Sequence, residues 1–398
     1  MTHRNCLSRR DFVAATTLGA VGLLRGTAAL AERPFLQAAD ALLYVGTYTE
    51  AGRTDGLYLL RMDSRTGALR HEEALDVGPN PSFLTIHPNG RTLYSVNEVN
   101  ETEGRPTGAV RAFGIDAESG ALTWLDEQPS EGAAPCYVSI DRKGRFALVA
   151  NYVSGTVAAL PIDDTGALSH AAHVVQQMGT GPVKSRQEHA HAHCVVAHPS
   201  NRFVMVADLG VDRVLVYRFD EATGALRHVE ESDAALPPGT GPRHLAFHPT
   251  LPLLFVSGEL SSTVVTLHCD PNFGTLRGAQ MLSTVPKGTT GENFPADIHV
   301  APSGRTLYVS NRGHNSVAVF SIGAKGTLAL QQVMSTGGDW PRNFTIDPTG
   351  RWLLVANQKS GSVVVFARDV ESGRLSTTSQ RITVPSPACL RFQSHAGV

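Results

Sequence analysis

Short apolar segments alternate with turn residues along almost the whole chain from about residue 42 onwards. Segments such as LLFVS at 253–257 and TLYVS at 306–310 are rich in Leu, Val and aromatic residues, and Gly, Pro, Asn or Asp stand at their ends. Brief runs of this kind predict β-strands rather than helices, which need longer stretches with a period near 3.6. We therefore expect an all-β protein.

The predicted strands recur as a repeat of about 50 residues. Each copy has an apolar strand, a turn of the Pro-x-Gly kind, a second apolar strand and then two more short strand signals. Six copies align without a gap, and they begin at Pro81, Pro135, Ala192, Pro242, Pro295 and Pro341. Four short strands in each copy are typical of one blade of a β-propeller.

The seventh copy is split between the two ends of the sequence. It begins at Pro387 with PACLRF, and LLYVGTYTE from Leu42 resembles its second half. The pattern thus predicts a seven-bladed β-propeller whose ring is closed by N-terminal strands completing the last blade. Because closure is expected to leave no free sheet edge, we expect a monomer or a weak dimer.

The N-terminus has the features of a removable export signal. The motif SRRDF at 8–12 precedes a weakly apolar run at 13–24, and ALA at 29–31 suits a cleavage site. Residues 1–31 therefore predict a twin-arginine signal peptide and a periplasmic or secreted protein. Residues 32–398 then form one propeller domain, which has no apolar stretch long enough to hold it in a membrane.

Composition excludes several classes of partner and site. With 34 basic and 36 acidic residues the net charge is −2, so nothing suggests a nucleic-acid partner. Too few cysteines follow the predicted signal for a disulfide framework, and no Cys-x-x-Cys suggests a zinc site. We expect free, buried thiols at Cys136, Cys194, Cys269 and Cys389.

Polar residues gather where the repeat predicts one mouth of the propeller. The first strand of a blade lines the axis and the second runs antiparallel beside it, so the start of the first and the end of the second share a face. The register brings to this mouth Glu98, His193, Arg243, His244, Glu259, Asp297, Arg312, Arg342 and Gln358. The like charges of Arg243, Arg312 and Arg342 repel unless an anion lies between them. A belt of ion pairs that only joins the blades is the alternative interpretation.

Several of these residues belong to longer motifs. They are GPRHLAFHP at 241–249, ELSSTV at 259–264, ADIH at 296–299, NR at 311–312, and PRNF at 341–344 with QKS at 358–360. Together they resemble the seven-bladed lactonase family that includes bacterial 6-phosphogluconolactonase and the fungal carboxymuconate-lactonising enzyme. The likeness extends over about residues 42–395.

The resemblance implies a small anionic or sugar lactone as substrate and no cofactor. The guanidinium fork of Arg243 suits a carboxylate, a phosphate or the oxyanion of an attacked lactone. Glu259 is expected to act as general base or proton donor, with His193 sharing the proton transfer. Arg312 and Arg342 are expected to anchor the substrate.

Other residues at this mouth are expected to contact or support the substrate. His244, Gln358 and Glu98 are candidate substrate contacts. For Asp297, together with His299, we expect a supporting role rather than direct chemistry.

Alternate histidines at 189, 191 and 193 raise the question of a metal site. Imidazoles spaced in this way could bind zinc or copper, but His189 and His191 precede the predicted strand. The favoured interpretation is that 183–192 form a loop without a bound metal. Of the three histidines, only His193 is then expected to reach the site.

Three functions remain open. The leading hypothesis is a metal-independent lactone hydrolase that uses acid–base chemistry and an arginine anion clamp. A muconate-type lactonising cycloisomerase needs the same groups without water as reactant, and many propellers only bind ligands. No Gly-x-Ser-x-Gly motif supports a serine nucleophile. The lactone itself is not specified by the sequence.

Overall fold

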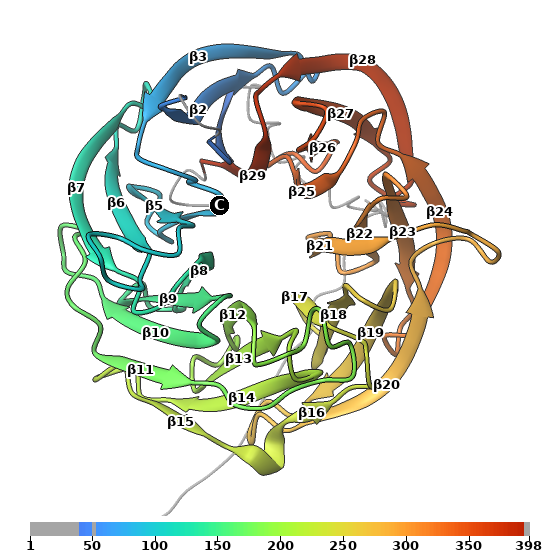
Figure 1. The fold of residues 1–398 in the computed structure, drawn as a ribbon. Coiled ribbons are helices and arrows are strands. Elements are labelled where there is room, and N and C mark those ends of the chain that lie inside the picture. Colours follow the sequence, from blue (N-terminus) through green and yellow to red (C-terminus); the bar gives the residue numbers. More distant parts are fainter. Residues whose placement is uncertain (1–39, 50–52, 394–398) are drawn as a thin grey trace, which may run out of the picture. The chain divides into compact units, whose positions relative to one another are not determined.

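The computed structural model describes residues 40–49 and 53–393, which form a ring of seven antiparallel sheets around a central axis (Figure 1). Apart from one 3-10 turn at Glu230–Ser232, the described residues contain no helix. The predicted all-β, seven-bladed propeller is therefore confirmed. The predicted signal at 1–31 lies outside the described residues.

We number the blades in chain order and give the strands of each from the axis outwards. Blade 1 consists of β4 (Leu84–Ile86), β5 (Thr92–Asn97), β6 (Ala109–Ile115) and β7 (Leu122–Pro129). Blade 2 consists of β8 (Pro135–Ile140), β9 (Phe146–Asn151), β10 (Thr156–Pro161) and β11 (His173–Gln176). Blade 3 consists of β12 (Ala192–Ala197), β13 (Phe203–Asp208), β14 (Arg213–Phe219) and β15 (Leu226–His228), and β16 (Ala234–Ala235) also pairs with β14. Blades 4 and 5 are β17 (Pro242–Phe247), β18 (Leu253–Gly258), β19 (Thr263–Cys269), β20 (Leu276–Ser283); and β21 (Phe294–Val300), β22 (Thr306–Arg312), β23 (Ser316–Ile322), β24 (Leu328–Ser335). Blades 6 and 7 are β25 (Pro341–Ile346), β26 (Trp352–Asn357), β27 (Ser362–Arg368), β28 (Leu375–Thr383); and β29 (Pro387–Phe392), β1 (Ala41–Thr47), β2 (Asp55–Met62), β3 (Leu69–Asp76).

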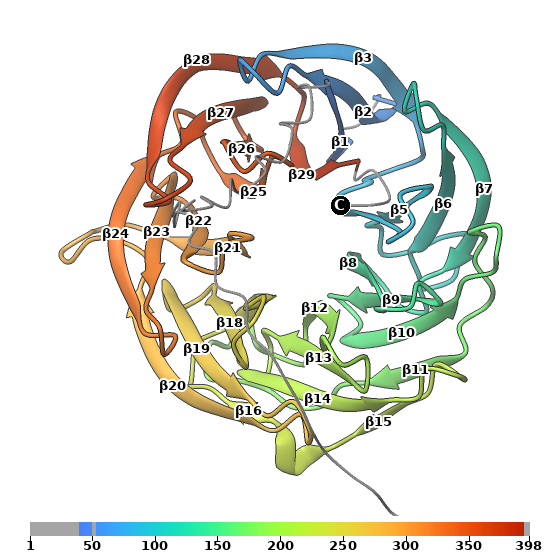
Figure 2. The ribbon, with the colours of Figure 1, turned by 180° about the vertical axis from the view of Figure 1, so that it is seen from behind.

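Blade 7 joins the two ends of the described chain. Strand β29 pairs antiparallel with β1, and Leu390 lies opposite Val45. Both views of the ring show the blue N-terminal strands beside the red β29 (Figure 2). The predicted closure of the ring by N-terminal strands is confirmed.

The second strand of each blade is buried on both faces because neighbouring sheets pack against each other. Every residue of β18 and β22 is buried, and one apolar cluster joins Tyr44, Val96 and Val149 from three successive blades. A strand buried on both faces has no reason to alternate, which explains the continuous apolar runs in the sequence. The expectation that closure leaves no free sheet edge is wrong, because the outermost strand of each blade has no partner on its outer side. Exposed charged side chains such as those of β3 oppose pairing with other chains at these edges.

Two turn histidines link neighbouring blades rather than forming a site. His87 Nε2 lies 2.8 Å from the carbonyl oxygen of Gly144, and His248 Nε2 lies 2.9 Å from that of Gly304. Because a carbonyl can only accept, each ring nitrogen donates. These His-Pro turns therefore each make a specific hydrogen bond to the next blade.

Candidate functional site

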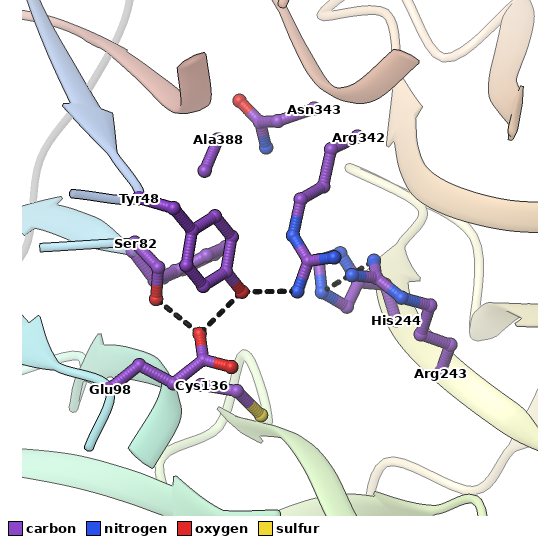
Figure 3. Close-up of a pocket in the computed structure, with 10 residues that line it drawn as sticks. Tyr48, Ser82, Glu98, Cys136, Arg243, His244, Arg342, Asn343 and Ala388 are labelled. Atoms are coloured by element: carbon purple, nitrogen blue, oxygen red, sulfur yellow. Dashed lines mark hydrogen bonds between the residues drawn. The ribbon is translucent and has the colours of Figure 1, made fainter. Parts of the chain in front are cut away.

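A small polar pocket, with about 10 Å³ of space for the centre of a water molecule, lies where the inner strands of blades 1, 2, 4, 6 and 7 begin. Its lining consists of Tyr48, Ser82, Phe83, Glu98, Cys136, Arg243, His244, Arg342, Asn343 and Ala388. Figure 3 shows Arg342 and the imidazole of His244 on one side of the pocket and Glu98 with Ser82 on the other. The repeat register therefore located this mouth correctly.

A bulge near the start of the inner strands brings adjacent residues into the same pocket. In blade 4 the register of β17 against β18 shifts between Pro242 and Leu245, and similar shifts occur in other blades. Strict alternation would send Arg243 and His244 to opposite faces, but a bulge turns neighbouring side chains towards one side. Both residues line the pocket for this reason.

A hydrogen-bond chain crosses the pocket from blade 6 to blade 1. A guanidinium nitrogen of Arg342 donates to the hydroxyl of Tyr48, and that hydroxyl donates to Glu98 Oε2 over 2.7 Å. The hydroxyl of Ser82 donates to the same carboxylate oxygen. Among the described residues Oε1 of Glu98 has no hydrogen-bond partner. One acceptor oxygen of this half-buried carboxylate is thus left for a bound molecule.

Glu259 lies outside the pocket lining, in a cluster of arginines. Its Oε2 is 2.6 Å from Nη2 of Arg312 and 3.0 Å from Nε of Arg243, and its Oε1 is 2.6 Å from Nη2 of Arg186. The carboxylate is only 3% exposed. Glu259 is therefore the anion that reduces the mutual repulsion of these guanidinium groups.

The arginines hold Glu259 ionised. Burial by itself raises the pKa of Glu259, but Arg312, Arg243 and Arg186 outweigh burial and lower it to about 2. Burial lowers the pKa of Arg312 to about 9, against the attraction of Glu259. A carboxyl group with so low a pKa carries no proton near neutral pH and is a weak base.

A second buried network supports the pocket from behind. Nη1 of Arg243 donates to Nε2 of His244 over 3.1 Å, so the proton of this neutral ring is on Nδ1, which donates to Asp297 over 2.8 Å. Asn343 also donates to Asp297. Burial and Arg243 lower the pKa of His244 to about 3, which keeps the ring neutral.

Asp297 also accepts a hydrogen bond from His299, with 2.9 Å between Oδ2 and Nε2. The two residues are separated by one position, so their side chains share a face of the strand. Burial raises the pKa of Asp297, but His299 and His244 lower it well below its usual range. These contacts make Asp297 the acceptor that orients two imidazoles, in keeping with the expected supporting role.

His193 contacts a residue that lines the pocket, but neither His193 nor Gln358 lines the pocket itself. The ring of His193 packs against those of His244 and Tyr152, and its Nδ1 is 3.7 Å from the sulfur of Cys136. Burial and Arg243 lower the pKa of His193 well below its usual value, so the ring is neutral. The side-chain oxygen of Gln358 is buried without a hydrogen bond among the described residues.

Two residues in these networks were not identified from the sequence. Tyr48 follows β1 at the position that Glu98 and Glu259 occupy in their own blades, and aligning LLYVGTY with TLYSVNE would have found it. Arg186 lies in the insert between β11 and β12, outside the repeat, and no register could place it.

The three alternate histidines do not form one cluster. His193 faces the site, whereas His189 and His191 lie beside Glu188. The ring of His191 stacks on that of Tyr152, with centroids 4.4 Å apart. Of the three, only His193 contacts a residue that lines the pocket, through its ring packing against that of His244. As expected, the four cysteines of the described region are free and buried.

The fold and the site together define a seven-bladed β-propeller with a pocket of arginines, histidines and carboxylates at one mouth of the ring. Residues 42–392 match the family model described as lactonase, 7-bladed beta-propeller. The chain belongs to this family. The predicted resemblance is confirmed, and with it the expectation of an enzyme of the lactonase class.

Three relatives illustrate the likeness. The chain is 38% identical over 350 residues to a 6-phosphogluconolactonase of Bacillus subtilis, covering 88% of this chain and 97% of that protein. It is 33% identical over 358 residues to a 6-phosphogluconolactonase of Formosa agariphila, covering 89% and 100%. The solved structure of the periplasmic gluconolactonase of Pseudomonas aeruginosa matches with a TM-score of 0.83 and 35% identity, covering 89% and 99%.

Proposed function

We propose that this protein hydrolyses a sugar-type lactone in the pocket between Arg342, Arg243 and Glu98. One observation carries the proposal: a carboxylate with a free acceptor oxygen faces guanidinium groups across a single small pocket. Water attack on a lactone needs an acceptor for the water proton and positive charge near the carbonyl oxygen. The relatives named as lactonases support the same reaction class.

The proposed reaction begins with a water bound to Oε1 of Glu98. Its oxygen attacks the lactone carbonyl carbon while Glu98 takes the proton, and Arg342 and Arg243 stabilise the oxyanion. The bond between the carbonyl carbon and the ring oxygen then breaks, and the proton returns from Glu98 to that oxygen. The product is a hydroxy acid, and no step requires a metal ion.

Glu259 has a different role in this proposal from the one expected from the sequence. Its pKa of about 2 does not favour proton donation, and the guanidinium groups that contact it occupy both of its oxygens. We assign it the positioning of Arg243 and Arg312. His193, neutral and beside the pocket, remains a candidate for sharing the proton transfer.

An anionic or polyhydroxylated lactone is the substrate class that the pocket favours. Arg186, Arg243, Arg312 and Arg342 outnumber the carboxylates Glu98, Glu259 and Asp297, so an added anion reduces the repulsion among them. Export through the predicted signal would place the protein where unphosphorylated sugar lactones arise. The periplasmic relative supports that location.

Proton release in a pH-stat tests the proposal, with glucono-1,5-lactone and its 6-phosphate measured against spontaneous hydrolysis. We expect acceleration by the wild-type protein and a loss of about 10²-fold or more in Glu98→Gln. Glu101→Gln, at an exposed neighbouring position, is the matched control and should retain activity. Faster hydrolysis of the 6-phosphate would assign a phosphate to the arginines.

The remaining outcomes separate the alternatives. Full activity in Glu98→Gln combined with loss in Glu259→Gln would return the role of general base to Glu259. Acceleration of neither lactone would favour the muconate-type cycloisomerase or a propeller that only binds its ligand. Binding of an aldonate without turnover would point to the latter.

A further inference from the structure

Three potential metal ligands converge in the loop between β11 and β12. Oε1 of Glu188 lies 3.3 Å from Nε2 of His191 and 3.6 Å from Nε2 of His189. One ligand atom from each residue lies within 4.8 Å of the other two. None of the three side chains lines the pocket of the proposed reaction.

The Nδ1 atom of each imidazole forms a hydrogen bond with a backbone carbonyl oxygen. Nδ1 of His191 lies 2.9 Å from the carbonyl oxygen of Tyr152, and Nδ1 of His189 lies 2.9 Å from that of Ala190. A carbonyl oxygen cannot donate, so both Nδ1 atoms carry the hydrogen. In a neutral ring this leaves a lone pair on Nε2, and a carbonyl partner of this kind commonly orients metal-binding histidines.

When both rings are neutral, two lone pairs therefore face the carboxylate of Glu188. We propose that Glu188, His189 and His191 bind a divalent transition metal ion, with zinc as the best match to two imidazoles and one carboxylate. Metal–ligand distances of about 2.1 Å in a tetrahedron place neighbouring ligands about 3.4 Å apart. The separations of 3.3 and 3.6 Å from Glu188 fit this geometry.

The site combines one fixed ligand with two accessible ones. His191 is 4% exposed, and its backbone N–H donates to Asp208 over 2.7 Å, so the ring is held in place. The side chains of Glu188 and His189 are about half exposed, at 52% and 50%. An ion can thus reach the site from solvent, and water can complete its coordination.

A metal ion here would restrain the loop that carries Arg186. Arg186, two residues before Glu188, donates to the hydroxyl of Tyr152 over 3.2 Å and to Glu259 over 2.6 Å. The ring of Tyr152 also stacks on His191. The ion would therefore restrain the segment that carries Arg186, without taking part in the attack on the lactone.

The test uses tag-free protein stripped with a chelator and then titrated with zinc chloride by calorimetry. We expect one ion per chain, with affinity lowered at least tenfold in Glu188→Gln and in His189→Ala. These exposed positions carry little risk to folding. His170→Ala, an exposed histidine elsewhere in blade 2, is the control and should bind like wild type.

Hydrogen exchange gives a second readout that needs no substrate. Zinc should slow exchange of the amides at 183–191 in the wild-type protein and leave it unchanged in His189→Ala. An absence of stoichiometric uptake, or equal uptake by wild type and both variants, would overturn the proposal and leave an ion pair between protonated His191 and Glu188. Neither measurement depends on whether the protein hydrolyses lactones.

Discussion

Glu259 and Arg312 form a buried ion pair between blades 4 and 5, with 2.6 Å between Oε2 and Nη2. Arg243 and Arg186 contact the same carboxylate, so its removal leaves several guanidinium groups facing one another in a buried site. Breaking a buried pair by removing one partner costs about 3–5 kcal/mol. We expect Glu259→Gln to lower the free energy of unfolding by about this amount, measured by urea denaturation.

A matched surface pair shows whether the effect depends on burial. Arg305 and Glu371 are 3.1 Å apart, but their side chains are 55% and 78% exposed. Exposed pairs contribute little because water and salt screen them. Glu371→Gln should leave the denaturation midpoint nearly unchanged, and equal losses in the two variants would contradict the positioning role of Glu259.

Tyr48 connects the arginine side of the pocket to its carboxylate side. In Tyr48→Phe the ring remains beneath the guanidinium of Arg342, 4.8 Å away, but the hydroxyl that bridges to Glu98 is lost. We expect kcat for lactone hydrolysis to fall about tenfold, because one oriented hydrogen bond is worth about 1–1.5 kcal/mol.

The control for this variant is Tyr94→Phe. The hydroxyl of Tyr94 also makes a buried hydrogen bond, 2.9 Å to the carbonyl oxygen of Gly166, but Tyr94 does not line the pocket. Its loss should lower stability without changing kcat. A similar fall in kcat in both variants would show that the effect of Tyr48→Phe is not specific to the site.

The repeat explains how much of the site could be read from the sequence. Copies aligned in register share a backbone geometry. Arg243 and Arg342 occupy the same position in their copies, and both line the pocket. Tyr48 was missed because its blade is split between the chain termini. Arg186 was missed because it lies in an insertion with no equivalent in the other blades.

The ion pairs between charged side chains were harder to predict from the sequence than the positions of those side chains. The sequence located Glu259 and Arg312, but their contact joins residues 53 positions apart and depends on side-chain conformations across two blades. The bulge in β17 was equally hidden, because a shift in register is a property of the pairing between two strands and not of the residue pattern of one strand. Short apolar runs therefore identified the strands, but they could not show that Arg243 and His244 both face the pocket.

The assembly state follows from the closed ring. Blade 7 pairs the two ends of the described chain, and the outer strands carry exposed polar residues that oppose edge-to-edge pairing. We expect a monomer or a weak dimer. Size-exclusion chromatography with light scattering should give a mass near that of one chain, and a stable larger oligomer would contradict this expectation.

Acid should destabilise the protein well above the range in which carboxylates usually titrate. Burial lowers the pKa of His244 from 6.5 in the unfolded chain to about 3, and it shifts His193 in the same direction. Below pH 6.5 the unfolded chain therefore binds more protons than the folded protein, so stability falls as the pH falls. Glu259, with a folded pKa of about 2 against 4.5, adds to the loss only below about pH 4.5.

Glu259 contributes little between pH 6.5 and 4.5, where the histidines are opposed by Asp208, because burial raises the pKa of Asp208 to about 6 and the folded protein takes up its proton there. Urea denaturation at several pH values should show stability decreasing across this interval in the wild-type protein. His244→Asn retains a polar side chain but cannot be protonated, so its stability should depend less steeply on pH there. A slope identical to that of wild type would mean that His244 is not held neutral by its burial beside Arg243 and Asp297.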